Sequence, residues 1–388
     1  MPALTFQSLD ETARQHYQRA LAAFYQAAVI HQLPVALWRY PRSKTQYAIV
    51  DFNGKPNTIK IDFHQKAPGF AFSPFVNQDN ENTLFISANL HLTPNGHQVF
   101  DMPPAGNVPA AEANKTRFLD TYHTLLHSDS RPPQSWVASR TQPHLCSEAE
   151  YCALVEAAID YTNSTGIKKI VTSRATETPL PDRFDPVATF KVLGDNYPHA
   201  FVSLVSIPTV GTWIGVSPEL LLSVTRNEAR TVALAGTQPR PENLPVGDVR
   251  WGAKEIEEQA LVSDYVRDFF QAQGFANFIQ DGPHTVTAGQ IVHLQTEFKL
   301  RLNEPALSDL ANHVLHTLHP TSAVCGMPKQ EALAFILEHE NYDRAFYSGF
   351  LGPIYLQGQS DLFVNLRCMQ LKQETAILYV GGGITKDS

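Results

Sequence analysis

The spacing of apolar residues changes along the chain, and each change predicts a change of element. In residues 1–28 the apolar positions recur at helical spacing, which predicts a helix. Residues 35–100 carry short β-type runs separated by proline and Asn-Gly, as expected for strands joined by turns. Residues 101–145 are proline-rich and weakly patterned, so they predict a connection over the surface between an N-terminal half and the rest.

The second half alternates helices with longer strands. Ser147, with Glu150 three residues later, fits a capping box, and Gly166 fits a C-terminal stop, so a helix is expected between them. Two further helices are expected over 253–273 and 329–339. The strand-like runs are 168–176, 200–207, 211–216, 219–225, 360–371 and 375–385. Long strands of antiparallel type with helices between them predict an α+β fold and not a doubly wound parallel sheet.

Composition limits the partners and the location. Of the 388 residues, 43% are hydrophobic and 18% are charged, as in proteins with a sizeable core. The formal net charge of −8 argues against nucleic acid or an anionic membrane as the main partner, although it does not exclude a small anionic substrate. No apolar run approaches the length of a membrane span, and the start lacks signal-peptide features, so a cytoplasmic protein is expected. The four cysteines match neither a zinc spacing nor a disulfide framework.

The stretch IGVSPELLLSV, residues 214–224, places an acid at the start of an apolar strand. Glu219 follows Ser217-Pro218 and precedes three leucines. It either points to solvent at the end of the turn or points into a site that needs an acid, and the pattern leaves both open. Arg367 is unusual for another reason, because an arginine inside a strand-like apolar run is costly unless it meets an anion.

Two pairs of charged residues have both a structural and a chemical interpretation. Glu255 and Glu258 are three apart on the helix expected over 253–273, so they face the same way. That arrangement suits Mg²⁺, but it also suits an ordinary solvated acidic face. Lys168 and Lys169 precede the apolar run IVTSR. Either lysine can serve as a general base if burial or another cation removes its proton, whereas the pattern alone favours two solvated charges at a strand end.

Weaker signals come from glycine-rich turns and one histidine. Gly236 and Thr237, in LAGTQPR, offer N–H groups and a hydroxyl that can hold a carboxylate. The run VGGGIT puts three glycines where a backbone can closely approach a ligand, although a glycine-rich turn is the simpler interpretation. His293 is more typical of a satisfied strand histidine than of a catalyst. Sequence motifs for P-loop nucleotide hydrolysis, dinucleotide binding and serine hydrolases are absent.

The order of these segments resembles a known family. The successive motifs of the chorismate-utilising enzymes are similar to segments of residues 146–388, in this order: KIVTSR, WIGVSPELLL, LAGT, KEIEEQ, IVHLQT, LHPTSAVCGMPK, RAFYSGFLG, VNLR and GGGIT. The family includes isochorismate, salicylate, anthranilate and aminodeoxychorismate synthases. The resemblance implies two large antiparallel sheets packed together and flanked by helices, with chorismate as the substrate and Mg²⁺ as the cofactor.

Within that family, particular positions point to water as the nucleophile. Isochorismate and salicylate synthases resemble this chain in having a lysine directly before a VVLSR-like strand, where it activates water, and Lys169 matches it. Aminodeoxychorismate synthases carry a nucleophilic lysine in a Pro-Ile-Lys-Gly-Thr motif, where this chain has Ala235. The segment LHPTSAVCG, with Ala323 and Val324, is more similar to isochorismate synthases. The resemblance therefore implies an isochorismate synthase, with salicylate synthase as the alternative.

The resemblance also implies a role for each matching residue. Lys169 would deprotonate water for attack at C2 of chorismate, and Glu219 would protonate the departing C4 hydroxyl. Glu255 and Glu258 would hold Mg²⁺ against the ring carboxylate. The substrate-binding residues that it implies are Gly236, Thr237, His293, Thr321, Ala323, Val324, Tyr347, Arg367, Gly381, Gly382 and Gly383.

The chain also departs from the family pattern. Gln259 stands where the family usually has histidine. Where the family continues into a final helix with a second Glu-x-x-Glu pair, this sequence stops at Ser388, so a catalytically impaired chorismate-binding protein is the alternative from another class. We expect a monomer with one domain over 1–388, in which 1–145 complete the sheets of a chorismate-binding core at 146–388.

Overall fold

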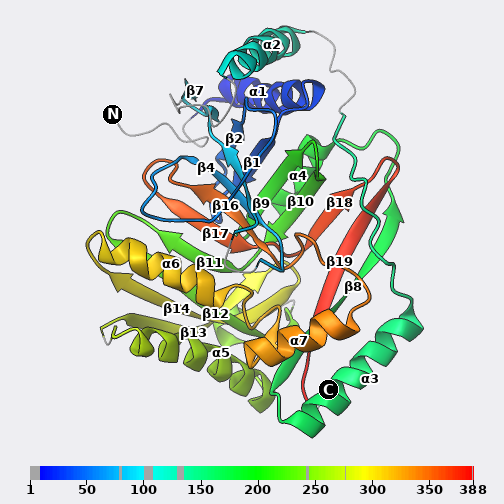
Figure 1. Cartoon of the computed structure of the whole chain (residues 1–388), viewed down its shortest axis with the longest axis vertical. Helices are drawn as coiled ribbons and strands as arrows, with labels where there is room; N and C mark the ends of the chain where they lie inside the picture. The colour runs from blue at the N-terminus through cyan, green and yellow to red at the C-terminus, as the bar shows by residue number, and fades with distance from the viewer. Residues whose placement is uncertain are drawn as a thin grey trace.

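The computed structural model describes residues 9–77, 81–99, 108–128, 135–241, 244–275, 277–386 and 388. Within these residues the strands form one sheet of ten and one of nine, and every named pair of neighbouring strands is antiparallel. A shared core of aromatic and aliphatic side chains joins the two sheets, and helices lie outside them (Figure 1). The α+β fold with two large packed sheets is therefore confirmed.

The ten-stranded sheet contains the strand that begins at Lys169. In spatial order its strands are β15 (Gly326–Met327), β8 (Lys169–Pro179), β19 (Thr375–Ile384), β18 (Cys368–Leu371), β10 (Gly211–Ser217), β9 (Phe201–Ile207), β1 (Val35–Arg39), β2 (Gln46–Val50), β6 (Leu90–Thr93) and β7 (Gly96–Val99). Strand β8 thus lies between β15 and β19, two strands that follow it by many residues in the sequence. This order brings the first residues of β8 close to the glycines of β19.

The nine-stranded sheet contains most of the other motifs. In spatial order its strands are β13 (Ile279–Ala288), β14 (Ile291–Arg301), β12 (Glu228–Pro239), β11 (Leu220–Val224), β17 (Ser360–Val364), β16 (Phe350–Ile354), β4 (Gly69–Ser73), β5 (Thr83–Ser87) and β3 (Asn57–Ile59). Strands from residues 35–99 therefore lie in both sheets. None of the helices in the described ranges is long and apolar enough to cross a membrane.

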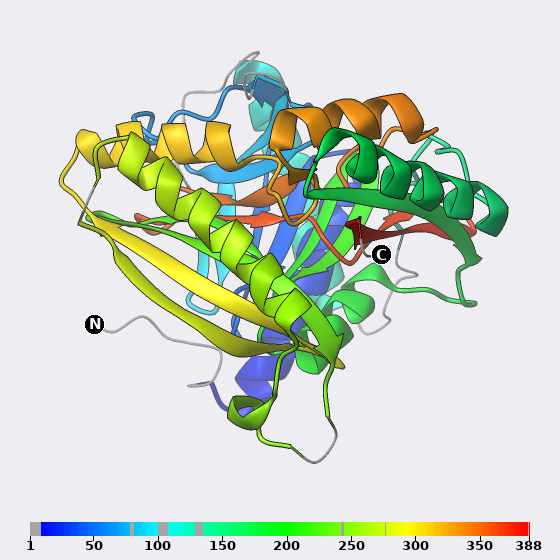
Figure 2. The same cartoon turned by 90° about the horizontal axis from the view of Figure 1, so that it is seen from below.

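Helices cover the outer faces of both sheets. They are α1 (Glu11–Ile30), α2 (Val108–His127), α3 (Glu148–Thr165), α4 (Pro186–Asn196), α5 (Ala253–Ala272), α6 (Ala306–Leu318) and α7 (Lys329–His339), with a short 3₁₀ helix at Val246–Asp248. Helices α1, α2 and α4 share a core with the ten-stranded sheet, and α5 and α6 share one with the nine-stranded sheet (Figure 2). Helices α3 and α7 pack on the start of β8.

Burial on both faces explains the continuous apolar runs. All residues of β9 are buried. Val202 and Leu204 face the core under the helices, whereas Phe201, Val205 and Ile207 face the other sheet. Successive side chains of a strand point to opposite faces, so a strand that is covered on both sides needs apolar residues at both sets of positions.

The local sequence signals were accurate where they concern helix ends. The capping box of Ser147 and Glu150 is present, and Gly166 takes the left-handed conformation at the C-terminus of α3.

The expectation of a weakly patterned connection was wrong over α2, because a helix of 20 residues occupies Val108–His127. Phe118 and Tyr122 of α2 make edge contacts with Phe24 of α1, so tertiary packing supports this helix.

Candidate active site

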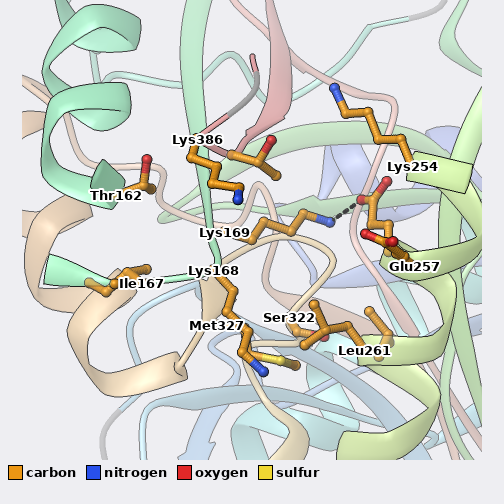
Figure 3. A pocket seen from close by; sticks show the side chains of 14 residues that line it. Thr162, Ile167, Lys168, Lys169, Lys254, Glu257, Leu261, Ser322, Met327 and Lys386 are labelled. Atoms are coloured by element: carbon orange, nitrogen blue, oxygen red, sulfur yellow. Dashed lines mark hydrogen bonds and ion pairs between the residues drawn. The ribbon is translucent and has the colours of Figure 1, made fainter. Parts of the chain in front are cut away.

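Lys169 opens β8 and points into the protein. It is 8% exposed, and its Nζ lies 2.5 Å from Oε1 of Glu258 on α5, the contact drawn as a dashed line in Figure 3. Lys168, one residue earlier, is exposed. Strand β8 begins at Lys169, so Lys168 lies just outside it, and of the two lysines only Lys169 is buried. The pattern alone favoured two solvated charges at the end of a strand. For Lys169 this expectation is wrong.

The carboxylates of α5 divide between two environments. Glu255 and Glu258 are half-buried and share one face of the helix, whereas Glu257 between them is exposed. Glu255 lies against Gly236, at an irregularity within strand β12 and not in a turn, where a Cβ would be 3.2 Å from the Cβ and from the carbonyl oxygen of Glu255. Gly236 has φ +60, and its lack of a side chain allows α5 to approach β12. The alternative interpretation from the sequence, an ordinary solvated acidic face, is thus excluded for Glu255 and Glu258.

Glu219 is buried between β10 and β11. It is 3% exposed, and its Oε1 accepts a hydrogen bond of 2.8 Å from the hydroxyl of Thr321. Its backbone N–H donates to Oγ of Ser217, which ends β10. Burial raises the pKa of the Glu219 carboxyl to about 7, although the Thr321 hydrogen bond and the positive charge of Lys169 oppose that rise. Glu219 therefore does not end the turn in solvent, and near pH 7 a large fraction of it carries a proton.

Three polar residues, Thr237, His293 and Arg367, form a connected group near Gly236. Nδ1 of His293 lies 3.0 Å from the hydroxyl of Thr237 and 3.2 Å from the carbonyl oxygen of Gly236. The guanidinium of Arg367 contacts Nε2 of His293 at 3.3 Å and donates to the carbonyl of Ala288 at 2.9 Å. Burial, together with the charge of Arg367, lowers the pKa of His293, so the ring is neutral at pH 7. Arg367 can only donate, so Nε2 accepts and Nδ1 carries the proton.

The three glycines of VGGGIT lie within β19 and not in a turn, which corrects the simpler interpretation of that run. Residues Gly381, Gly382 and Gly383 pair with Ser173, Thr172 and Val171 of β8. A Cβ at Gly383 would lie 2.7 Å from Cε of Lys169, and a Cβ at Gly381 would lie 2.9 Å from the hydroxyl of Tyr347. The buried Tyr347 has its pKa raised to about 12 by desolvation, so it stays a neutral hydroxyl.

The segment that follows α6 contributes residues of different exposure. Thr321 and Ala323 are half-buried, whereas Val324 is 3% exposed and packs in the core under α5 and α6. Thr321 is thus the member of this segment that reaches Glu219.

A cavity of about 330 Å³ opens beside the Lys169–Glu258 pair. Charged residues make up much of its wall: Figure 3 labels Lys168, Lys169, Lys254, Lys386 and Glu257, and Glu258 lines it as well. Within the described part of the chain, its lining does not include Thr237, His293 or Arg367. The structure joins the two groups through α5, because Glu255 contacts Gly236 of β12 and Glu258 forms an ion pair with Lys169.

We predict that Gly383→Ala lowers kcat on the order of 10- to 100-fold. The new methyl group must displace the side chain of Lys169, and misplacing a reacting group by about 1 Å has effects of that size. Gly247→Ala is the control, since its methyl group would meet no atom within 4 Å and Gly247 lies outside the proposed site. Steady-state kinetics of both variants test the contact, and equal effects would contradict it.

Solved structures share this architecture. The menaquinone-specific isochorismate synthase of Escherichia coli superposes with a TM-score of 0.72 at 19% identity, over 95% of this chain and 86% of that chain. Anthranilate synthase component I of Streptococcus pneumoniae superposes with a TM-score of 0.61 at 18% identity, over 92% of this chain and 86% of that chain. At these identities the similarity establishes the fold.

Sequence comparisons identify the family. A putative isochorismate synthase of Aeromonas hydrophila is 30% identical over 320 residues, which are 79% of this chain and 76% of the relative. The vibriobactin-specific isochorismate synthase of Vibrio cholerae is 27% identical over 292 residues, or 73% of each chain. The sequence profile described as "Chorismate binding enzyme" matches residues 69–388. The chain therefore belongs to the family of chorismate-binding enzymes.

Proposed function

We propose that the protein is an isochorismate synthase, an isomerase that adds water at C2 of chorismate and removes the C4 hydroxyl. The family and the isochorismate synthases among its relatives support this activity. The observation that carries the assignment is a buried lysine, Lys169, whose charge acts on a buried acid, Glu219, with a pKa raised to about 7. Ala235 occupies the position of the lysine of amine-transferring relatives.

The two buried groups divide the proton transfers. Lys169 is ion-paired with Glu258, so the proposal requires that it give up the proton of that pair before its Nζ accepts one from the attacking water. Glu219 donates the proton of its carboxyl to the departing C4 oxygen, which leaves as water. One water enters and one leaves, so the product is an isomer of the substrate and no redox cofactor takes part. An acid whose pKa lies near the operating pH is well suited to such a transfer.

The polar groups around this pair bind the substrate. Arg367 supplies a positive charge for a carboxylate, and Gly236 and Thr237 supply an N–H and a hydroxyl. The proposal assigns two further groups to substrate binding. They are the backbone of Gly381, Gly382 and Gly383, and the segment that contains Thr321, Ala323 and Val324. His293 lies by the ring, and Tyr347 lies by the enolpyruvyl group.

Glu255 and Glu258 are the residues that would hold Mg²⁺. Among the residues that the structure describes, no three His, Cys, Asp or Glu side chains are grouped so as to hold a metal by themselves. Two carboxylates on one helical face nevertheless fit this ion, which commonly takes one or two carboxylates and completes its shell with water and substrate oxygens. Bound there, Mg²⁺ would neutralise and orient the substrate carboxylate.

We predict that Glu255→Gln raises the Mg²⁺ concentration needed for half-maximal activity by at least about tenfold, because a ligand is lost. Glu257→Gln is the matched control: this neighbour on the same helix is exposed and is expected to leave the Mg²⁺ dependence unchanged. A titration of activity with Mg²⁺ after chelation measures both. An unchanged curve for Glu255→Gln would remove Glu255 from the metal site.

Product analysis tests the proposed function. The protein is incubated with chorismate and Mg²⁺, and the products are separated by chromatography. Isochorismate as the main product supports the assignment. Salicylate with pyruvate would instead indicate a salicylate synthase, and anthranilate formed with ammonia would overturn the role of Lys169.

Three further proposals concern the whole protein. They are a cytoplasmic location, a monomeric state and a single domain over 1–388, and they are tested by fractionation, light scattering and limited proteolysis, respectively.

A further inference from the structure

A buried ion pair lies behind the site and has no role in the chemistry above. Glu340 follows α7, and Arg344 comes four residues later. Each side chain is 2% exposed, and the guanidinium donates to both carboxylate oxygens, at 2.5 and 2.7 Å. The face of Phe75 lies 4.3 Å from the guanidinium carbon. A buried pair of this kind is a weak source of stability, because desolvation offsets most of the attraction.

The remaining hydrogen bonds of the pair extend to two other segments. Arg344 donates to the carbonyl of Val171 on β8 at 2.7 Å and to the carbonyl of Val324 at 2.8 Å. Glu340 accepts from the backbone N–H of Ser173 at 2.7 Å and from the hydroxyl of that serine at 3.2 Å. The planar guanidinium sets the directions of its bonds, so it holds the two carbonyls in a defined relative position.

These two segments carry the proposed base and the partner of the proposed acid. Val171 is two residues after Lys169 on β8. Val324 is three residues after Thr321, whose hydroxyl donates to Glu219. The segments also meet directly, since the N–H of Val171 donates to the carbonyl of Cys325 at 2.8 Å. Arg344 therefore bridges them at the point where they run side by side.

We propose that the Glu340–Arg344 pair is a positioning device that holds Lys169 and Thr321 in register, so that base and acid act on one substrate molecule. This inference rests on the proposed function. Neither residue touches the substrate; both act through the backbone of β8 and of the 321–325 segment. A device of this kind affects the chemical step more than the binding of chorismate, because a displacement of about 1 Å at a reacting group can lower the rate about 100-fold.

The test compares two buried arginines. Arg344→Lys keeps the charge but cannot reproduce the planar set of bonds, and it is expected to lower kcat about 10- to 100-fold with KM for chorismate changed by less than about threefold. Arg39→Lys is the matched control. Arg39 is 3% exposed and donates to backbone carbonyls of residues outside the proposed site: Tyr40, Ser43, Tyr197, Pro198 and Ala200. Both variants are expected to lower Tm, and only Arg344→Lys is expected to lower kcat per folded molecule.

Each result decides the inference. If kcat per folded molecule of Arg344→Lys equals that of the wild type while Tm falls as in Arg39→Lys, the pair is structural and the inference is wrong. If Arg344→Lys does not fold, Glu340→Gln replaces it, because glutamine keeps the shape and one acceptor; a kcat equal to the wild type then has the same meaning. Wild-type turnover is measured first, so a failure of the proposed function is seen in the product and not in the ratio of variant to wild type.

Discussion

Lys169→Ala is expected to lower kcat for isochorismate formation by at least about 100-fold, because the proposed general base is lost. The fold is expected to survive. The substitution removes one ion pair with Glu258, whose side chain is 28% exposed and remains solvated after the change. Steady-state kinetics with chorismate and Mg²⁺, together with circular dichroism, measure the two effects separately.

Lys168→Ala provides the contrast at the residue directly before β8. Lys168 lines the same cavity but is exposed, and the ion pair of Glu258 is with Lys169, so substitution of Lys168 is expected to change kcat only slightly. If the two alanine variants have similar activity, Lys169 is not the base. Loss of folded protein in Lys169→Ala alone would instead show that the ion pair with Glu258 has a larger structural role than its exposure suggests.

Glu219→Gln is expected to lower kcat by about 100-fold or more, because the amide cannot donate the proton that the C4 oxygen needs. Glutamine keeps the shape of the side chain and still accepts the hydrogen bond from Thr321. In the wild type, activity is expected to fall as pH rises through about 7, where Glu219 loses its proton. A pH profile of kcat for the wild type that stays flat between pH 6 and about pH 9 would contradict the assignment.

The same substitution has a predicted effect on stability. The pKa of Glu219 is raised from 4.5 to about 7 by burial, so the folded state is penalised as pH rises from 4.5 and most strongly above 7. Glutamine carries no charge and removes that penalty. We therefore expect Glu219→Gln to be more stable than the wild type at pH 8, by about 3 kcal/mol at most, with the difference shrinking towards pH 4.5. Urea unfolding at pH 5 and pH 8 measures it, and a difference independent of pH would contradict the cause.

The secondary structure was predictable wherever its determinants are local. Ser147 and Glu150 cap α3 through their own side chains, and Gly166 ends the helix through its backbone conformation. Helix α2 was not predictable, because its buried residues are few and it depends on packing against α1. The alternation of Phe201, Val202 and Leu204 between two cores likewise emerges only when a second sheet and a helical layer cover β9.

The site was predictable in part. The pattern alone left Lys168 and Lys169 equivalent, and it left Glu219 between solvent and interior. It gave no reason to single out Glu340 and Arg344, which at a spacing of four residues read as an ordinary surface helical pair. The structure buries that pair, since α7 ends at His339 and the chain then turns inward beneath β8 and the 321–325 segment.

The sequence by itself determined the order of the motifs, and with it the family and the residue types available for chemistry. The tertiary structure decided which of those residues are buried and which face one another. The reason is physical: the pKa of Glu219 and the ion pair of Lys169 with Glu258 depend on desolvation and on contacts between distant segments. Thr321 reaches Glu219 across 102 positions of the chain. Local spacing carries no information on such contacts, whereas the packing of two sheets with α5 and α7 specifies them.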